Sequence, residues 1–150
     1  MGAIKHLTRL SDFTIEEIKE ILERANRYAS GEELPKLEGK VIANLFFEPS
    51  TRTQYSFMMA EQKLGLQMMD FTAETSSVQK GETLYDTVKT FEAIGVDGVV
   101  IRHPQNNYFE ELIPHLNSSP GVTGISGLHS RRTRGDRHSS LVTAGPIDLI

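Results

Sequence analysis

Apolar runs alternate with helix-like stretches along the first 116 residues of the chain. The runs are short and rich in valine, isoleucine, methionine and phenylalanine, and they predict buried strands at residues 41–47, 67–71 and 97–101. The stretches around them repeat apolar residues with helical spacing, and we expect helices at residues 14–30, 54–64, 82–94 and 108–116. Strands that alternate with helices favour parallel pairing, so the pattern predicts an α/β fold with a doubly wound parallel sheet.

The first two helices carry signals for their ends and for their buried faces. Thr14 and Glu17 have the spacing of a capping box, and Gly31 is a suitable residue to stop the first helix. Gly65 is placed to end the second helix. The stripe expected to be buried on the first helix consists of Ile18, Ile21, Leu22 and Ala25. The stripe expected on the second consists of Tyr55, Met58, Met59, Gln62 and Leu66.

A polar turn, Ser50-Thr51-Arg52-Thr53, separates the first strand from the second helix. Pro49 ends the strand because proline has no N–H to give to a sheet. The first N–H groups of a helix lack partners within the helix and can bind an anion, to which hydroxyls and a planar guanidinium add donors. An ordinary serine or threonine N-cap beside a surface arginine explains the same residues, so the pattern alone leaves both interpretations open.

A second arginine, Arg102, comes at the end of the third predicted strand. Parallel strands end at the same edge of a sheet, and ligands of doubly wound sheets bind beyond that edge, so we expect Arg102 to lie near the polar turn. The loop at residues 72–81 contains Ser76 and Lys80 and is long enough to suggest a function. An ordinary solvated loop is the alternative.

Composition limits the classes of function. The 150 residues carry a net charge of −4, and no cysteine is present, which excludes disulfides and thiolate metal sites. The five histidines share no metal-binding spacing, so we expect neither a metal nor another cofactor. No run is long enough to cross a bilayer and the first residues do not read as a secretory leader, so we expect a cytoplasmic protein without a membrane partner.

Residues 117–150 differ from the rest of the chain. They hold five of the twelve glycines and carry four arginines against two aspartates, so the remaining residues have 12 basic and 18 acidic side chains. That acidic body argues against general nucleic-acid binding, although a basic nucleic-acid arm is an alternative for the tail. No strand or helix period persists before residue 141. We therefore expect one domain at residues 1–116 and an atypical, disordered segment at 117–150.

Three spaced motifs give the chain a family resemblance. Residues 47–57, Phe-Glu-Pro-Ser-Thr-Arg-Thr-Gln-Tyr-Ser-Phe, resemble the carbamoyl-phosphate signature of the aspartate and ornithine carbamoyltransferases. The segments 76–84 and 100–104 resemble the next two motifs of that family and follow in the same order. The resemblance covers roughly residues 5–116, the first half of such an enzyme.

The resemblance implies transfer of the carbamoyl group of carbamoyl phosphate to an amine, without a metal or redox cofactor. Ser50, Thr51, Arg52, Thr53 and Arg102 would bind carbamoyl phosphate, and Arg52, Thr53 and Arg102 would be the catalytic residues. Ser76 and Lys80 match residues that enter the site of a neighbouring subunit, so the resemblance also implies a homotrimer. His103 lies beside the family's arginine and is given no catalytic role.

The acceptor amine follows from the same comparison of motifs. Lys80 directly before Gly-Glu-Thr, and Glu48-Pro49 before the polar turn, are similar to the aspartate enzymes, which implies L-aspartate as acceptor and a place in pyrimidine biosynthesis. An ornithine carbamoyltransferase relative is the alternative. The family's His-Pro-x-Gln motif and second domain do not appear in this sequence. We therefore expect the chain to bind carbamoyl phosphate without completing the reaction alone, or to be a non-catalytic phosphate-binding or oligomerising module.

The family pattern also suggests a second explanation for residues 117–150. Family members continue with a strand and then with His-Pro-Thr-Gln-Ser-Leu-Leu-Asp-Leu or a close variant. One permitted set of codons for residues 142–148, read one base later, encodes Ser-Leu-Leu-Asp-Leu-Leu. A frameshift near Asn117 would explain both the unusual composition and the missing histidine motif, so the tail is expected to be disordered or translated out of frame.

Overall fold

The computed structural model describes residues 6–8, 10–72, 81–105, 107–116 and 121–126. Ser76 and Lys80, and the tail from residue 127 onward, lie outside the described residues. Four strands, β1 (Val41–Phe46), β2 (Gln67–Thr72), β3 (Gly98–His103) and β4 (Gly121–Ser126), form one sheet. All neighbouring pairs are parallel, and the strand order is β2-β1-β3-β4.

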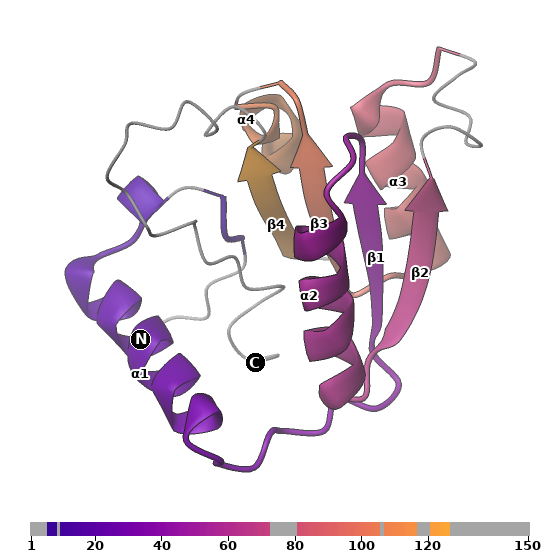
Figure 1. Ribbon diagram of the computed structural model, residues 1–150. Helices are drawn as coiled ribbons and strands as arrows, with labels where there is room; N and C mark the ends of the chain where they lie inside the picture. The colour runs from indigo at the N-terminus through magenta and orange to yellow at the C-terminus, as the bar shows by residue number, and fades with distance from the viewer. Residues whose placement is uncertain (1–5, 9, 73–80, 106, 117–120, 127–150) are drawn as a thin grey trace.

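Helices lie on both faces of this sheet, as the alternating pattern predicted. Figure 1 shows α2 (Thr51–Lys63) in front of the sheet, with α3 (Leu84–Ile94) and the short α4 (Phe109–Leu112) behind it. The remaining elements are the 3-10 turns η1 (Leu10–Asp12) and η3 (Ile113–His115) and the separate helix α1 (Ile15–Ala29). The expected doubly wound α/β fold is confirmed, and among the described residues no helix is long and apolar enough to span a membrane.

Each face of the sheet has its own apolar cluster, because consecutive side chains of a strand point to opposite faces. The cluster beneath α2 consists of Ile42, Phe46, Phe57 and Val100. The larger cluster beneath α3 and α4 consists of Ala43, Leu45, Val88, Val96, Val99, Ile101, Tyr108, Phe109 and Leu112. The strands β1 and β3 are covered on both sides, which explains why their sequences are apolar without alternation.

The helix ends largely follow the sequence signals. In α1, the Thr14 backbone N–H donates to Glu17 Oε2 at 2.8 Å and the Glu17 N–H donates to Thr14 Oγ1 at 3.2 Å, so the predicted capping box is present. A second capping box, which we did not predict, joins Thr83 and Asp86 at the start of α3. Gly95 ends α3 with φ of +99°, a left-handed conformation that glycine adopts without a Cβ penalty.

The predicted buried face of α2 was wrong. Tyr55 and Met59 are 63% and 54% exposed, whereas the buried helix residues are Phe57 and Glu61. The sequence pattern placed apolar side chains inward, but one of the positions that faces the sheet holds a carboxyl group. Helical spacing therefore identified the helix and misjudged its rotation about its own axis.

The expected end of the domain at residue 116 also needs correction. β4 pairs in parallel with β3 from Gly98↔Gly121 to His103↔Ser126, so the sheet extends beyond that residue. Gly121 and Gly124 interrupt the apolar pattern of this strand, because glycine lacks a side chain to pack. The segment therefore lacked the apolar run by which the other strands were found.

Candidate functional site

The strand order places a topological switch between β1 and β3. After β1 the chain passes through α2 to β2 on one side, and it then crosses through α3 to β3 on the other side of β1. Connections that leave in opposite directions open a crevice at the carboxyl ends of the two strands. The polar turn follows β1, and Arg102 lies near the end of β3, in register with Phe46. The predicted site residues that the structure describes therefore share this edge.

The turn into α2 presents its donors without using them for a side-chain cap. Ser50 is the N-cap residue, and its side chain makes no capping hydrogen bond. The Gln54 N–H donates to the Ser50 carbonyl oxygen at 2.9 Å, which closes the first helical turn and leaves the N–H groups of Thr51, Arg52 and Thr53 without partners in the helix. Ser50 therefore occupies the N-cap position, but its hydroxyl does not cap the helix as the N-cap interpretation would require.

Arg52 extends from the first turn of α2 as an exposed side chain. Within the described part of the chain the structure gives its guanidinium no ion pair. Thr51 is also exposed, while Ser50 and Thr53 are half-buried. The turn thus offers backbone N–H groups, three hydroxyls and one guanidinium within four residues, a donor set that suits a phosphate or another oxyanion.

Arg102 is held by Glu48. Its Nε and Nη2 atoms donate to Glu48 Oε1 at 3.1 and 2.9 Å, and the two side chains are 20% and 25% exposed. Glu48 comes two residues before the polar turn, so the ion pair ties the end of β3 to the entrance of that turn. A guanidinium has five N–H donors, so three remain for another ligand. The sequence motif drew attention to Arg102, but the pairing with Glu48 was not predicted.

His103 packs rather than projecting into solvent. Its ring lies 5.2 Å from that of Phe47 and 5.3 Å from that of Tyr108, measured between centroids. Its Nδ1 accepts the Gln105 backbone N–H at 3.1 Å, which requires an unprotonated Nδ1. Burial lowers the pKa of His103, and the nearby Glu48 carboxylate opposes that effect only partly. These contacts are consistent with a neutral, packed imidazole.

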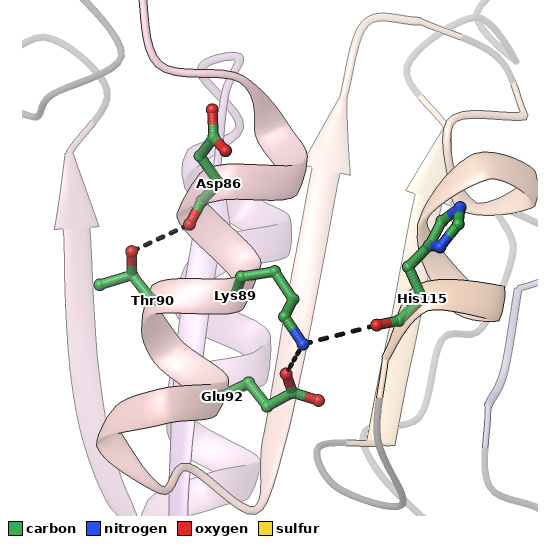
Figure 2. A network of polar contacts seen from close by, with 5 residues as sticks. All are labelled: Asp86, Lys89, Thr90, Glu92 and His115. Carbon is green, nitrogen blue, oxygen red and sulfur yellow. Dashed lines mark hydrogen bonds and ion pairs between the residues drawn. The ribbon is translucent and has the colours of Figure 1, made fainter.

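Hydrogen bonds attach the segment after β3 to β3 itself and to α3. Tyr108 donates its buried hydroxyl to the Ile101 carbonyl oxygen at 2.9 Å. Lys89 of α3 pairs with Glu92 and also donates to the His115 carbonyl oxygen at 3.4 Å, which joins α3 to η3 (Figure 2). A groove of about 530 Å³ lies along this side, lined by Thr83, Leu84, Tyr85, Gln105, Tyr108, Glu111, Leu112 and His115. Of the expected site residues that the structure describes, none lines this groove.

Comparisons with known proteins agree with this arrangement. Residues 5–132 match the family model described as aspartate/ornithine carbamoyltransferase, carbamoyl-P binding domain. The chain belongs to the aspartate/ornithine carbamoyltransferase family. The match extends past residue 116, where we expected the resemblance to end, and it includes β4.

Curated and solved carbamoyltransferases support the assignment. The aspartate carbamoyltransferase catalytic subunit of Staphylococcus carnosus (strain TM300) is 52% identical over 130 residues, which are 84% of this chain and 42% of the relative. The catalytic subunit of M. jannaschii aspartate transcarbamoylase superposes with a TM-score of 0.71 at 35% identity, over 82% of this chain and 42% of that one. The Trypanosoma cruzi enzyme in complex with carbamoyl phosphate gives a TM-score of 0.69 at 32% identity, over 81% and 38%.

The chain therefore spans about two fifths of the length of the relatives that it matches. The match covers the carbamoyl-phosphate-binding domain of the family. Ser50, Thr51, Arg52, Thr53 and Arg102 lie at the edge of the sheet where that ligand is expected. The structure leaves the placement of Ser76 and Lys80 open, because both lie outside its described residues.

Proposed function

We propose that this chain binds carbamoyl phosphate at the turn between β1 and α2, as the first half of an aspartate carbamoyltransferase. The observation that carries the proposal is the uncapped start of α2, where the Ser50 hydroxyl and the first helical N–H groups are directed to no partner of their own helix. The phosphate group would accept hydrogen bonds from Ser50, Thr51 and Thr53, and the guanidinium of Arg52 would contact the leaving phosphate. Thr53 would also reach the carbonyl oxygen.

Arg102 would bind the opposite side of the ligand. It approaches from β3, on the other side of the switch point, and Glu48 holds its guanidinium by two hydrogen bonds to one carboxylate oxygen. Carbamoyl transfer forms an oxyanion at the carbonyl carbon while phosphate departs, and fixed cationic donors stabilise both charges. Arg52, Thr53 and Arg102 are therefore our proposed catalytic residues.

Our proposals for the acceptor and for the assembly rest on the relatives rather than on the geometry of the site. The named relatives are aspartate carbamoyltransferases, which favours L-aspartate over ornithine as acceptor and a role in pyrimidine biosynthesis. The Trypanosoma cruzi enzyme has been crystallised with carbamoyl phosphate and aspartate together. We propose a cytoplasmic homotrimer in which Ser76 and Lys80 reach a neighbouring site. We expect the 150-residue chain by itself to bind carbamoyl phosphate without measurable transfer.

Titration calorimetry with carbamoyl phosphate and with inorganic phosphate tests the proposal. Arg52→Ala should weaken binding by about 2–4 kcal/mol, the range for truncating one partner of a partly desolvated charged contact. Arg27→Ala is the matched control, because Arg27 is an exposed arginine that pairs with Glu32 and belongs to α1, a helix that lies away from the sheet (Figure 1). Equal binding by the wild-type chain and Arg52→Ala would reduce the polar turn to a helix start. A carbamoyl-aspartate assay on the same samples checks for transfer.

A further inference from the structure

The contact between α2 and β1 contains two buried polar side chains. Asn44, at the centre of β1, is 0% exposed, and Glu61, in the third turn of α2, is 1% exposed. Asn44 Nδ2 donates to Glu61 Oε2 at 2.8 Å. The remaining polar atom of each side chain, Asn44 Oδ1 and Glu61 Oε1, is also buried and has no hydrogen-bond partner among the described residues. Two buried acceptors that lie in one pair of side chains and lack donors require an explanation, because such atoms are costly to leave unpaired.

The surroundings of Glu61 disfavour a carboxylate. The apolar side chains of Phe57 and Val100 belong to the cluster on this face of the sheet. On β2, Asp70 is in register with Asn44, which places its carboxylate on the same face as Asn44. Burial raises the pKa of Glu61 above its ordinary value of 4.5, Asp70 raises it further, and the hydrogen bond from Asn44 opposes both only in part. Asp70 is the charged group that acts on Glu61 from the neighbouring strands.

A single proton satisfies both unpaired oxygens. A neutral Glu61 carries a hydroxyl on Oε1, which can donate to Asn44 Oδ1 while Asn44 Nδ2 continues to donate to Oε2. The result is a ring of two hydrogen bonds between a carboxylic acid and a carboxamide. An ionised Glu61 would instead place an uncompensated charge among apolar side chains and leave Asn44 Oδ1 without a donor.

We propose that Glu61 is a positioning residue, held as a neutral acid in a two-hydrogen-bond pair with Asn44, that fixes α2 against β1. Glu61 lies on the helix whose first turn carries Ser50 to Thr53, so the pair also sets the position of the anion-binding donors. That second step rests on the proposed function, whereas the protonation of Glu61 does not.

Titration of the wild-type chain and of Glu61→Gln decides the first step. Carbon-13 resonances of the glutamate side chains should include one that titrates above pH 4.5 and that disappears in Glu61→Gln. A Glu61 resonance that titrates at or below pH 4.5 overturns the proposal. Glu23→Gln is the matched control, because Glu23 is an exposed glutamate on α1.

The pH dependence of stability gives an independent readout. The folded state binds the Glu61 proton more tightly than the unfolded state, so this stabilisation is complete below pH 4.5 and is lost as the pH rises through the folded-state pKa. Between pH 4.5 and that pKa the unfolding constant of the wild-type chain should rise about tenfold per pH unit relative to Glu61→Gln, and above that pKa the ratio of the two constants should level off. Glutamine has the shape of the neutral acid and can form both hydrogen bonds, so Glu61→Gln should fold normally. If it is instead as unstable as Glu61→Ala at every pH, the carboxylate itself is required and the proposal is wrong.

Inorganic phosphate binding tests the link to the site. The ratio of wild-type to Glu61→Gln affinity cancels the titration of phosphate, and it should fall as the pH passes the pKa of Glu61. A constant ratio refutes the positioning role. If neither protein binds phosphate or carbamoyl phosphate, the proposed function and this link both fail, while the carbon-13 titration still decides whether Glu61 is neutral.

Discussion

Replacing Glu48 by glutamine should strengthen phosphate binding. Arg102 donates two N–H groups to Glu48 Oε1, at 3.1 and 2.9 Å, so a phosphate must compete with a carboxylate for the same guanidinium. Glutamine keeps the length of the side chain and an oxygen acceptor but removes the competing negative charge. Loss of that charge should leave Arg102 in place while making more of its positive field available to the ligand.

The size of the effect follows from the exposure of the pair. Exposed ion pairs are worth about 0.2–1 kcal/mol, and this pair, with side chains 20% and 25% exposed, belongs at the upper end of that range. Freeing Arg102 should therefore lower the dissociation constant for phosphate about fivefold, which corresponds to about 1 kcal/mol. The same estimate limits the loss of folding stability to about 1 kcal/mol.

Calorimetry with inorganic phosphate at low and moderate salt measures this effect. Glu33→Gln is the control for the change in net charge, because Glu33 is exposed in the segment between α1 and β1. The gain in Glu48→Gln should exceed that in the control and shrink with added salt. Weaker binding by Glu48→Gln would refute the reasoning, since it would mean that Glu48 orients Arg102 for the ligand rather than competing with it.

Three further predictions concern stability and the end of the chain. Tyr108→Phe should cost about 1–3 kcal/mol in urea unfolding, because it leaves the buried Ile101 carbonyl oxygen without the tyrosine hydroxyl, and a loss near zero would show that this bond contributes nothing. Gly95→Ala should cost about 1–2 kcal/mol through its φ of +99°, although no atom lies within 4 Å of the added Cβ, and Gly95→Asn should cost less. Equal losses would contradict a backbone cause. The nucleotides that encode residues 117–150 should encode His-Pro-x-Gln followed by Leu-Asp when they are read in another frame. If neither of the other two frames encodes these motifs, the frameshift is rejected.

The parts of the fold that could be predicted are those that depend on residues close together in the sequence. Thr14 and Glu17 identified the start of α1 because a capping box depends only on residues three positions apart. Strands β1 and β3 could be recognised because burial on both faces makes their sequences apolar throughout. The parallel, doubly wound arrangement followed from the alternation of these elements, and it predicted that Arg102 and the polar turn lie at one edge of the sheet.

The parts that could not be predicted depend on contacts between distant residues. Glu61 reads as a surface residue of a helix, and only its pairing with Asn44, seventeen positions away, explains why that side of α2 is buried. The strand β4 is held by its pairing with β3 rather than by its own composition. The ion pair of Arg102 with Glu48 likewise joins residues 54 positions apart, and no local signal indicates it.

The separate position of α1 has a consequence for how the chain opens. Figure 1 shows this helix away from the sheet, and none of its fifteen residues is buried, with Ile15 and Leu22 67% and 50% exposed. Its capping box and its helical hydrogen bonds join neighbouring residues, so little packing against the other described elements is lost when it unfolds. We expect amide hydrogens of α1 to exchange through small local fluctuations, while those of β1 and β3 exchange only when the sheet itself unfolds. The helix and the sheet would then behave as separate cooperative units, and the edge where we propose that phosphate binds belongs to the more stable of the two.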